Sequence, residues 1–565
     1  MDASSQSTVQ KPGRELGDSP RFRQARIVEQ AEQIGFWWRS RRQVARQLGV
    51  PDSSFRYCLR EHQDRCRESR TSPALVRFCE SPEGLAFLHR LQAALHLVFV
   101  QSNDCGLRSV GWFLRLAGLE EFLPASYGAQ QAVAAEMETL LAEFGREEDQ
   151  RLAMQMPHRE ISLCEDETFH PQICLVAIEP VSDFLLLEQY APQRDAETWN
   201  RCLDERLAGW SVTVIQVASD EAKALIAHAE GHLGAHHSPD LFHVQQDLVH
   251  ATSLALAGQT RRAHQAATDA QQLTAQRRAE LTACQEQCSQ SSYPLVLQQQ
   301  VDQAEVEEVA KRQQLAACQQ RQQQATAARR SLSHDYHPID LETGRPREAS
   351  EVGQRLKEDC DRLDEIAREA GLSPHSREKL AKARRVLNAM QKTIAFFWAT
   401  VGARLASWKL SAAVMVWMRE ALIPGLYLVS AAEKASTAAE RQRLRARAEE
   451  VLARARSPDG VWGSLSVDEQ ADLEAKARQC AALFQRSSSC VEGRNGQLSL
   501  RHHGLHRLTS RKLGALRVIH NYLVERRDGT TAAERFFGAG PQPLFAWLLA
   551  RLPLPSRPHK CRRVD

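Results

Sequence analysis

The hydrophobic period of the chain changes at Ile161, and this change most constrains the fold. Upstream, apolar side chains recur at helical spacing, whereas the segments that follow alternate or run continuously apolar, as β-strands do. The predicted order is strand, strand, strand, helix, strand, helix, strand, at residues 161–169, 173–178, 184–188, 195–208, 212–220, 221–233 and 240–244. This order predicts an α/β core with a five-stranded mixed sheet. Strand patterns vanish after His250, so the chain as a whole is predicted to be mostly α-helical and multidomain.

Acidic residues stand at the ends of two predicted strands. Side chains alternate across a strand, so Asp166 faces one side of the sheet while Glu165 and Glu167 face the other. Asp220 stands where the fourth strand ends, which is the usual place for function on such a sheet. The order of elements is of ribonuclease-H type, a topology in which these two strand ends are adjacent. Two neighbouring carboxylates repel unless a dication lies between them, so a metal site is predicted here.

Glu492 is the only acidic residue between Ala475 and Val524, a stretch that carries nine lysines and arginines and four histidines. A basic surface of this density suits a polyphosphate backbone, and a single acid inside it suits a metal ion at that phosphate. The neighbouring Arg494 and Asn495 would suit a phosphate beside the metal. Ser489 and Glu492 also match a capping box, which would make the glutamate purely structural.

Residues 40–60 have the spacing of a helix-turn-helix, in which the second helix reads the major groove. Apolar residues fall on the inner faces of both helices, and Arg56 and Arg60 project outward from the second. With Arg41 and Arg42 of the first helix, they are the predicted DNA contacts. Helix-turn-helix shapes without DNA function are also common, and that alternative stays open.

Several other polar residues have competing interpretations. Asp240 rivals Asp220 as second acid, but its place before a predicted strand favours a turn. His243 could neighbour the site or be a core histidine. His228, His232 and His236 are four residues apart, a spacing that could bind zinc, but no Cys or acidic ligand accompanies them at metal spacing. A solvated face or a phosphate contact is therefore expected for these three.

The bulk composition excludes some classes of protein. The net charge is only +3, so basic character is local. The fourteen cysteines contain no CxxC pair, which argues against a zinc ribbon or a disulfide framework. The polar start, Met1 to Glu15, does not resemble a signal peptide. The most apolar stretch, 410–432, is interrupted by charged residues and a proline, so we expect a buried helix and no membrane partner.

These segments together resemble the DDE transposases of bacterial insertion sequences. The resemblance rests on Cys-Glu-Asp166-Glu-Thr-Phe, Val-Ala-Ser-Asp220-Glu, Pro-Asp-Leu-Phe-His-Val-Gln, Cys-Val-Glu492-Gly-Arg-Asn-Gly and Asp-Gly-Thr-Thr-Ala-Ala-Glu-Arg-Phe-Phe. It implies a ribonuclease-H-like core whose catalytic, metal-binding triad is Asp166, Asp220 and Glu492. It also implies two Mg²⁺ ions, for which Mn²⁺ can substitute, and cleavage and strand transfer of double-stranded DNA at transposon ends and target. A homo-oligomer on DNA in the bacterial cytoplasm, at the nucleoid, is expected.

The resemblance organises the chain into consecutive regions. They are a disordered N-terminus (1–20), a helix-turn-helix DNA-binding domain (21–70), a helical DNA-binding or linker region (71–157), the first part of the core (158–257), an all-helical insertion with a helical hairpin (258–470), core helices bearing the third acid (471–540), and a Pro/Arg-rich tail (541–565). The hairpin has helical periodicity over residues 258–330 and is either a coiled coil or a solvated spacer, since its heptads are poor in Leu and Ile.

Two other functions compete with the transposase. One is a catalytically inactive, transposon-derived DNA-binding protein that uses the N-terminal helices for binding. The other is a nuclease on the same ribonuclease-H fold. The presence of all three acids favours catalysis, and a strand-transfer assay separates a transposase from a nuclease, which cleaves but never joins ends.

Overall fold

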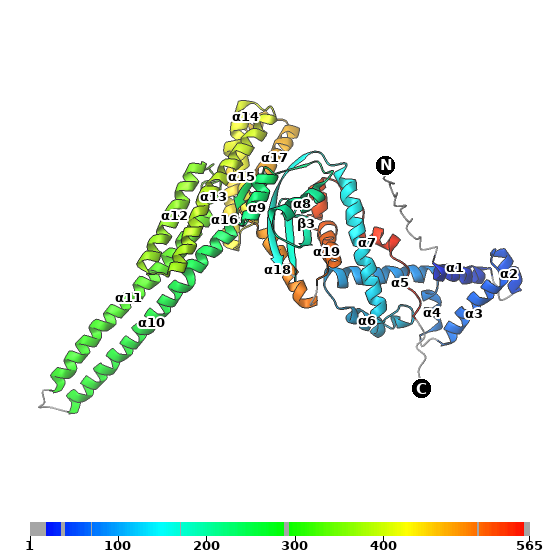
Figure 1. Cartoon of the computed structure of the whole chain (residues 1–565), viewed down its shortest axis with the longest axis horizontal. Coiled ribbons are helices and arrows are strands. Elements are labelled where there is room, and N and C mark those ends of the chain that lie inside the picture. The colour runs from blue at the N-terminus through cyan, green and yellow to red at the C-terminus, as the bar shows by residue number, and fades with distance from the viewer. Residues whose placement is uncertain are drawn as a thin grey trace, which may run out of the picture. The chain divides into compact units, whose positions relative to one another are not determined.

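The computed structural model describes residues 19–34, 40–68, 71–169, 171–287, 293–505 and 508–558. It is mostly helical with one five-stranded sheet (Figure 1). The chain divides into two compact units: the first holds Met1–Glu160, Glu167–Thr213 and Val491–Asp565, and the second holds Ile161–Asp166 and Val214–Cys490. Residues 1–18 of the predicted disordered N-terminus and 559–565 of the predicted tail lie outside the described residues, as do His506 and Arg507.

The sheet confirms the predicted mixed sheet within a mostly helical chain. Its strands are β1 (Arg159–Phe169), β2 (Ile173–Glu179), β3 (Phe184–Ala191), β4 (Val212–Ser219) and β5 (His236–Pro239), arranged in the order β3-β2-β1-β4-β5. β2 and β3 pair antiparallel, as expected for a hairpin, and β4 and β5 pair parallel. Helix α8 (Ala196–Leu207) connects β3 to β4. The centres of β1, β2 and β3 are buried, which explains the nearly continuous apolar sequences of β2 and β3.

The predicted fifth strand at 240–244 is wrong. The strand is β5, which ends at Pro239, and helix α10 (Leu241–Gln287) begins two residues later. Four apolar or aromatic residues in a row fit a strand or a buried helix equally well. The helix forms here because the carboxylate of Asp240 accepts the backbone N–H of Phe242 (2.9 Å) and satisfies one of the donors that a helix start leaves open.

The first unit begins with α1 (Pro20–Gln33), α2 (Arg41–Gln47) and α3 (Asp52–Glu68). The side chain of Ser40 accepts the N–H of Gln43 and caps α2. Gly49 adopts φ +64 in the turn that follows, a conformation that glycine reaches without steric cost. The small core of this region consists of Ala31, Val44, Ala45, Phe55 and Leu59.

The rest of the first unit is helical around β2 and β3. Its helices are α4 (Pro73–Cys79), α5 (Pro82–Leu95), η3 (His96–Ser102), α6 (Leu107–Leu116), η4 (Leu119–Glu121), α7 (Tyr127–Ala153), most of α18 (Ser489–Leu505), α19 (Ser510–Tyr522), α20 (Ala532–Phe537) and α21 (Leu544–Arg551). Helices α7 and α19 approach closely at Gly145, where an added Cβ would lie 2.5 Å from Val518 Cγ2. Residues far apart in the sequence therefore share one core.

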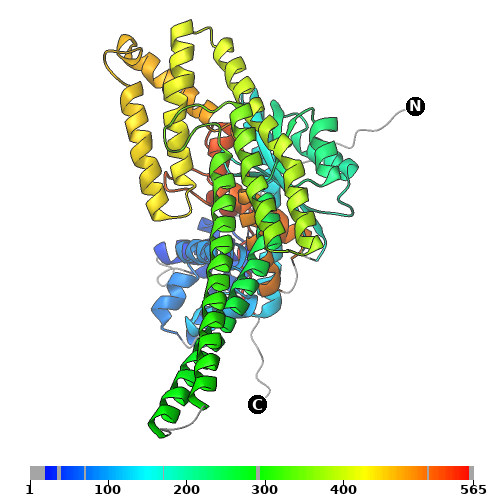
Figure 2. The same cartoon turned by 90° about the vertical axis from the view of Figure 1, so that its left-hand side faces the viewer.

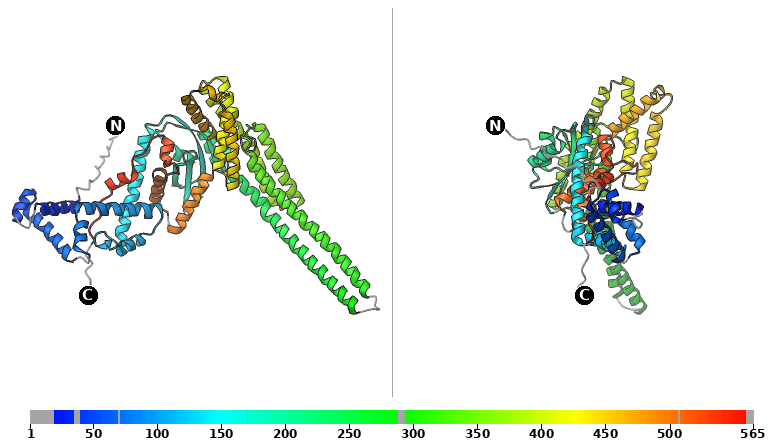
Figure 3. Two further views of the ribbon diagram at one scale, coloured as in Figure 1. Left: turned by 180° about the vertical axis from the view of Figure 1, so that it is seen from behind. Right: turned by 90° about the vertical axis from the view of Figure 1, so that its right-hand side faces the viewer.

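The second unit contains the long helical hairpin. Helix α10 and helix α11 (Tyr293–Asp335) lie side by side in all views (Figures 2 and 3). The hairpin begins at Leu241 rather than at residue 258, so its first turn directly follows β5. The remaining helices are α9 (Lys223–Ile226), η5 (Ala227–His232), α12 (Ala349–Glu369), α13 (Pro374–Ser407), α14 (Ala412–Trp417), η6 (Met418–Leu422), α15 (Ile423–Glu433), α16 (Ala438–Ala455), η7 (Trp462–Ser464) and α17 (Val467–Ala481).

One continuous helix in the described part of the chain, Ala412–Glu433, is long and apolar enough to cross a membrane by length and composition alone. Of the residues in its most apolar 18-residue stretch, 44% are buried. Met418, Leu422 and Leu428 are nevertheless fully buried in the core of the second unit. These contacts fit the core helix that the interrupting charges predicted.

Candidate metal centre

A cavity of about 270 Å³ in the second unit opens at the carboxyl ends of β4 and β5. Asp220 follows β4, Asp240 follows β5, and both line the cavity together with His243. The two strands are parallel, so their ends meet at one edge of the sheet, and the N–H of Asp240 donates to the carbonyl of Ser219 (2.9 Å). This edge therefore collects polar side chains from successive crossovers.

Asp240 is the most firmly held carboxylate of this group. It is 1% exposed. Its Oδ1 accepts the N–H groups of Phe242 (2.9 Å) and Ser488 (3.1 Å), and its Oδ2 accepts the Ser488 hydroxyl (2.7 Å) and His243 Nδ1 (2.7 Å). Burial opposes ionisation, but these hydrogen bonds hold the pKa of Asp240 below its usual value. Asp240 is thus an ionised anchor whose oxygens are already occupied.

His243 binds Asp240 and lines the cavity together with Asp220. The hydrogen bond from Asp240 raises the pKa of His243 to about 9 despite burial, and the charges of Asp240, Asp166 and Asp220 raise it further. With Nδ1 bound to Asp240, the second ring nitrogen is oriented away from that carboxylate and remains a donor when the ring is protonated.

The alternation of β1 separates Asp166 from its acidic neighbours. Glu167 accepts the indole N–H of Trp199 (3.1 Å), and Glu165 lies 3.5 Å from His228 Nε2. Asp166 is half-buried on the opposite face, the face on which Cys164 donates to the Ser487 carbonyl (3.6 Å). The middle acid of Glu-Asp-Glu is thus on the opposite face of β1 from both of its acidic neighbours.

Asp220 forms a turn rather than the cap of a helix beginning at Glu221. Its Oδ1 accepts the N–H of Ala222 (2.9 Å), and α9 begins at Lys223. The predicted single helix to Leu233 is α9 followed by the π-helix η5, a form that is frequent at functional sites. The Asp220 charge is one of the causes that raise the pKa of Lys382, after its hydrogen bond to Asp247.

Glu492 reaches this group through the start of its own helix. Helix α18 begins at Ser489, immediately after Ser488, whose backbone and hydroxyl are both bound to Asp240. Ligand atoms of Asp240, His243 and Glu492 lie within 4.8 Å of one another. A capping box that uses Ser489 does not fit, because Ser489 is the first helical residue and not the residue before the helix.

The donor chemistry of the group suits a hard divalent cation. Carboxylate oxygens are the ligands that Mg²⁺ and Mn²⁺ prefer, and one imidazole is compatible with Mn²⁺. Asp240 makes four hydrogen bonds and is better suited to orient His243 than to bind a metal directly. Asp166, Asp220 and Glu492 are therefore the candidate ligands, and His243, whose raised pKa favours the protonated form, stands beside them as a hydrogen-bond donor.

The basic surface predicted around Glu492 is wrong for four of its residues. Arg494 is 6% exposed. It donates to Glu188 of β3 from both Nε (2.5 Å) and Nη2 (2.8 Å), so its predicted phosphate contact is wrong as well. Arg486 donates to the Ser333 carbonyl, Arg501 pairs with Asp104, and Lys512 donates to the Val100 carbonyl. These cations hold the fold together. Asn495 is half-buried, and its role as a DNA contact stays a prediction.

The histidine series also differs from expectation. His228 is fully buried against Glu165, an acidic neighbour supplied by β1 and invisible in the local spacing. His236 stacks on Phe396, with ring centroids 4.5 Å apart, and bonds to Thr393 Oγ1 (3.1 Å). A solvated face is therefore wrong for these two residues. Within the described part of the chain, the group that meets metal-ligand spacing is Asp240, His243 and Glu492.

The predicted DNA contacts of the N-terminal helices lie at the surface of the first unit. Arg41, Arg42 and Arg60 are exposed, and Arg56 is 52% exposed while it pairs with Asp52 (2.8 Å). Phe55 and Leu59 are buried on the opposite face of α3. The arrangement leaves one face of α3 basic and accessible.

Comparison with known proteins gives one partial match. A family of unknown function, DUF6399, matches residues 418–564, a region that includes Glu492. No curated protein and no solved structure matches the chain.

Proposed function

We propose that this protein is a metal-dependent DNA transposase of the DDE type, with Asp166, Asp220 and Glu492 as the acidic triad. The observations that carry the proposal are that ligand atoms of Asp240, His243 and Glu492 lie within 4.8 Å of one another, and that Asp220 lines the same cavity as Asp240 and His243. Asp166 comes from the central strand, Asp220 from the end of the neighbouring strand, and Glu492 from a helix beyond the long insertion. Acids that repel one another without a cation are typical of metal-assisted phosphoryl transfer.

The architecture supports the ribonuclease-H-like assignment. Three strands are followed by a helix, a strand, two short helical segments and a parallel edge strand, with β1 in the middle of the sheet. The insertion between β5 and α18 is entirely helical within the described residues, apart from its loops and turns. An insertion at this point lengthens the sequence between Asp220 and Glu492 without separating their elements, because Ser488 is bound to Asp240.

The residues divide the chemistry among them. A bound divalent metal supplies Lewis-acid activation of the attacking and leaving oxygens. In cleavage, a water oxygen bonds to phosphorus, the bond from phosphorus to the 3′-oxygen breaks, and the 3′-oxygen takes a proton. In strand transfer, that 3′-oxygen loses its proton and bonds to a target phosphorus, the bond from this phosphorus to the target 3′-oxygen breaks, and the released 3′-oxygen takes a proton. Protonated His243, held by Asp240, is placed to donate a hydrogen bond to the charged phosphate.

The proposal is tested by Mn²⁺- or Mg²⁺-dependent nicking and end joining on DNA that carries the sequences flanking the gene. Asp166→Asn, Asp220→Asn and Glu492→Gln should each abolish both reactions. Glu167→Gln is the matched control, because its side chain lies on the other face of the same strand, bound to Trp199. Nicking without joining would indicate a nuclease, and full activity in the three variants would refute the triad. Assembly as a homo-oligomer on DNA is part of the same proposal.

A further inference from the structure

Three arginines in the first unit share a single buried carboxylate. Glu80 is 5% exposed. It receives Arg21 (3.2 Å), Arg65 (3.0 Å) and Arg557 (2.9 Å). Glu61 lies further from Arg557, at 4.0 Å. The cluster therefore holds more positive than negative charge in a mostly buried position, which is costly unless an anion compensates.

Arg557 lies on the C-terminal segment, residues 552–557, which packs against the N-terminal helices. The Leu552 carbonyl accepts His89 Nε2 (2.9 Å), the Pro555 carbonyl accepts Arg21 Nη1 (3.1 Å), and Arg557 Nη1 donates to Gln24 Oε1 (2.7 Å). These contacts fasten the segment along α1 and α5. Helix α1 and the segment from Leu552 to Arg557 thus pack together, although they are far apart in the sequence.

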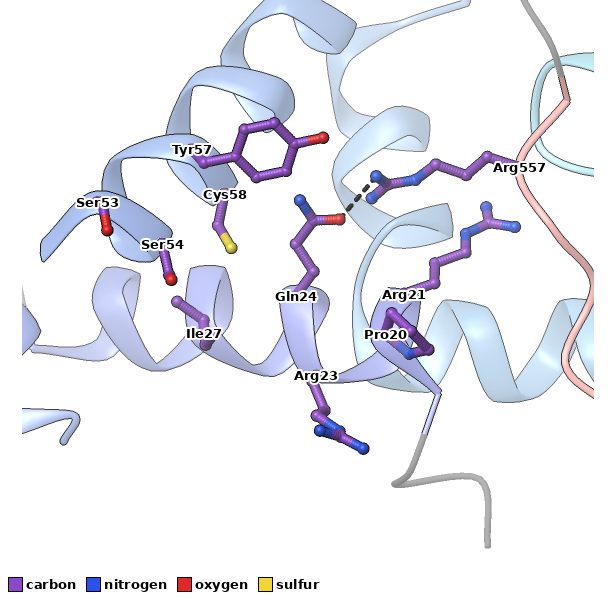
Figure 4. A pocket seen from close by; sticks show the side chains of 10 residues that line it. All are labelled: Pro20, Arg21, Arg23, Gln24, Ile27, Ser53, Ser54, Tyr57, Cys58 and Arg557. Atoms are coloured by element: carbon purple, nitrogen blue, oxygen red, sulfur yellow. Dashed lines mark hydrogen bonds between the residues drawn. The ribbon is translucent and has the colours of Figure 1, made fainter. Parts of the chain in front are cut away.

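A cavity of about 740 Å³ adjoins this cluster, and both Arg21 and Arg557 line it (Figure 4). The Nε groups of Arg21 and Arg557 are buried without a hydrogen-bond partner. Arg21 is 7% exposed, so its Nε–H is an unsatisfied donor in a buried guanidinium. Burial lowers the pKa of Arg21, and Arg557 and Arg65 lower it further against the attraction of Glu80. An anion in the cavity would relieve this repulsion.

The geometry points to a phosphate-binding site in this cavity, formed by Arg21 and Arg557, so that the C-terminal segment completes the DNA-binding surface of the N-terminal helices. The Nη1 and Nη2 groups of Arg21 are bound to the Phe122 and Pro555 carbonyls and to Glu80, so its Nε–H is the donor available to a phosphate oxygen. Ser53, Ser54 and Tyr57 of α3 line the same cavity, and α3 also carries the exposed Arg56 and Arg60. A phosphate of the DNA backbone is therefore the favoured source over free phosphate, and this choice of source rests on the proposed DNA function.

The test compares Arg557→Gln with wild type in two assays on the full chain. In the first assay, the anisotropy of a labelled duplex is measured over a range of salt concentrations. The slope of log Kd against log salt should be smaller for Arg557→Gln than for wild type by about 0.9, which corresponds to the loss of one phosphate contact. Thermal melting in inorganic phosphate, against chloride at equal ionic strength, measures the free anion. Arg551→Gln is the matched control, since Arg551 lies over the Trp547 ring and outside the cavity lining.

Gln24→Glu covers the case in which Arg557→Gln does not fold. This nearly isosteric change places a carboxylate beside Arg557 as an internal substitute for phosphate. It should keep or raise the melting temperature while reducing the salt slope. A reduced slope in both variants supports a backbone phosphate, whereas phosphate-specific stabilisation of wild type alone, with unchanged slopes, supports free phosphate. If neither variant changes the salt slope and phosphate does not stabilise wild type, the proposed site is wrong. Wild type that binds no DNA but gains stability from phosphate would refute the proposed function and retain the site.

Discussion

The hydroxyl of Ser488 donates a hydrogen bond to Oδ2 of Asp240 (2.7 Å) across a sequence separation of 248 residues. The Ser488 N–H binds the other oxygen of the same carboxylate (3.1 Å). The two ends of the helical insertion are therefore held together by the hydrogen bonds between Ser488 and Asp240, the residue that follows β5. Because α18 starts at the next residue, this closure also sets where Glu492 stands.

Asp240 should stabilise the fold, whereas Asp220 should serve metal binding and not stability. Asp240→Asn loses the charge that four hydrogen bonds stabilise, so we expect a loss of about 2–4 kcal/mol in the free energy of unfolding. Asp220→Asn removes repulsion among the acids and should leave metal-free stability equal or higher. Urea denaturation in EDTA measures both. Equal destabilisation by the two variants would contradict this division of roles.

The ion pair of Arg494 and Glu188 should stabilise the fold rather than bind DNA. Glu188→Gln leaves a buried guanidinium without its counter-charge, so we expect a loss of about 3 kcal/mol. Glu205→Gln, which breaks an exposed pair with Arg201, should cost less than about 1 kcal/mol. Chemical denaturation tests the difference. If Glu188→Gln were as stable as the control variant, the assigned role of Arg494 would be wrong.

DNA binding should depend on the exposed face of α3. Replacing Arg56 and Arg60 together with Ala should weaken binding to the proper DNA ends by about 2–6 kcal/mol if each contacts a base, with little change in melting temperature. The paired change of Arg362 and Arg368 to Ala on α12 removes equally exposed charges elsewhere. Anisotropy at fixed salt distinguishes the two, and an equal effect of both pairs would contradict specific readout by α3.

His236 should make stability fall with acidification. Burial lowers the pKa of His236 from 6.5 to about 4, with His237 and Lys392 adding to the effect. Between these pH values the unfolded chain binds a proton that the folded chain does not, so stability decreases as the pH falls through this window. The loss should reach about 3 kcal/mol near pH 4. In His236→Gln this part of the pH dependence should vanish. The free energy of unfolding is measured from pH 7 to pH 4 for both proteins, and the same pH dependence in the variant and in wild type would exclude this role of His236.

The sequence predicted the elements whose pattern is local. Alternation in β1 separates Asp166 from Glu165 and Glu167, and the apolar spacing of α2 and α3 places Phe55 and Leu59 inside. It did not predict long-range pairing. Nothing near Arg494 in the sequence signals Glu188, and nothing near His228 signals Glu165.

The role of Asp240 was missed for a related reason. The apolar run after it fits a strand or a helix, and the choice depends on the Asp240 hydrogen bonds with Phe242, His243 and Ser488. The available signal was the spacing of Asp240 and His243 by three residues, which puts both on one helix face. That signal has meaning only if the helix starts at Leu241, as it does.

Calorimetric titration with Mn²⁺ tests the central claim most directly, because it needs neither a DNA sequence nor turnover. Wild type should bind Mn²⁺, and Asp166→Asn, Asp220→Asn and Glu492→Gln should each weaken binding by about tenfold or more. Glu167→Gln should bind as wild type does, since that side chain is held by Trp199 on the other face of β1. Binding that is undiminished in all three triad variants would show that these acids do not form a metal centre.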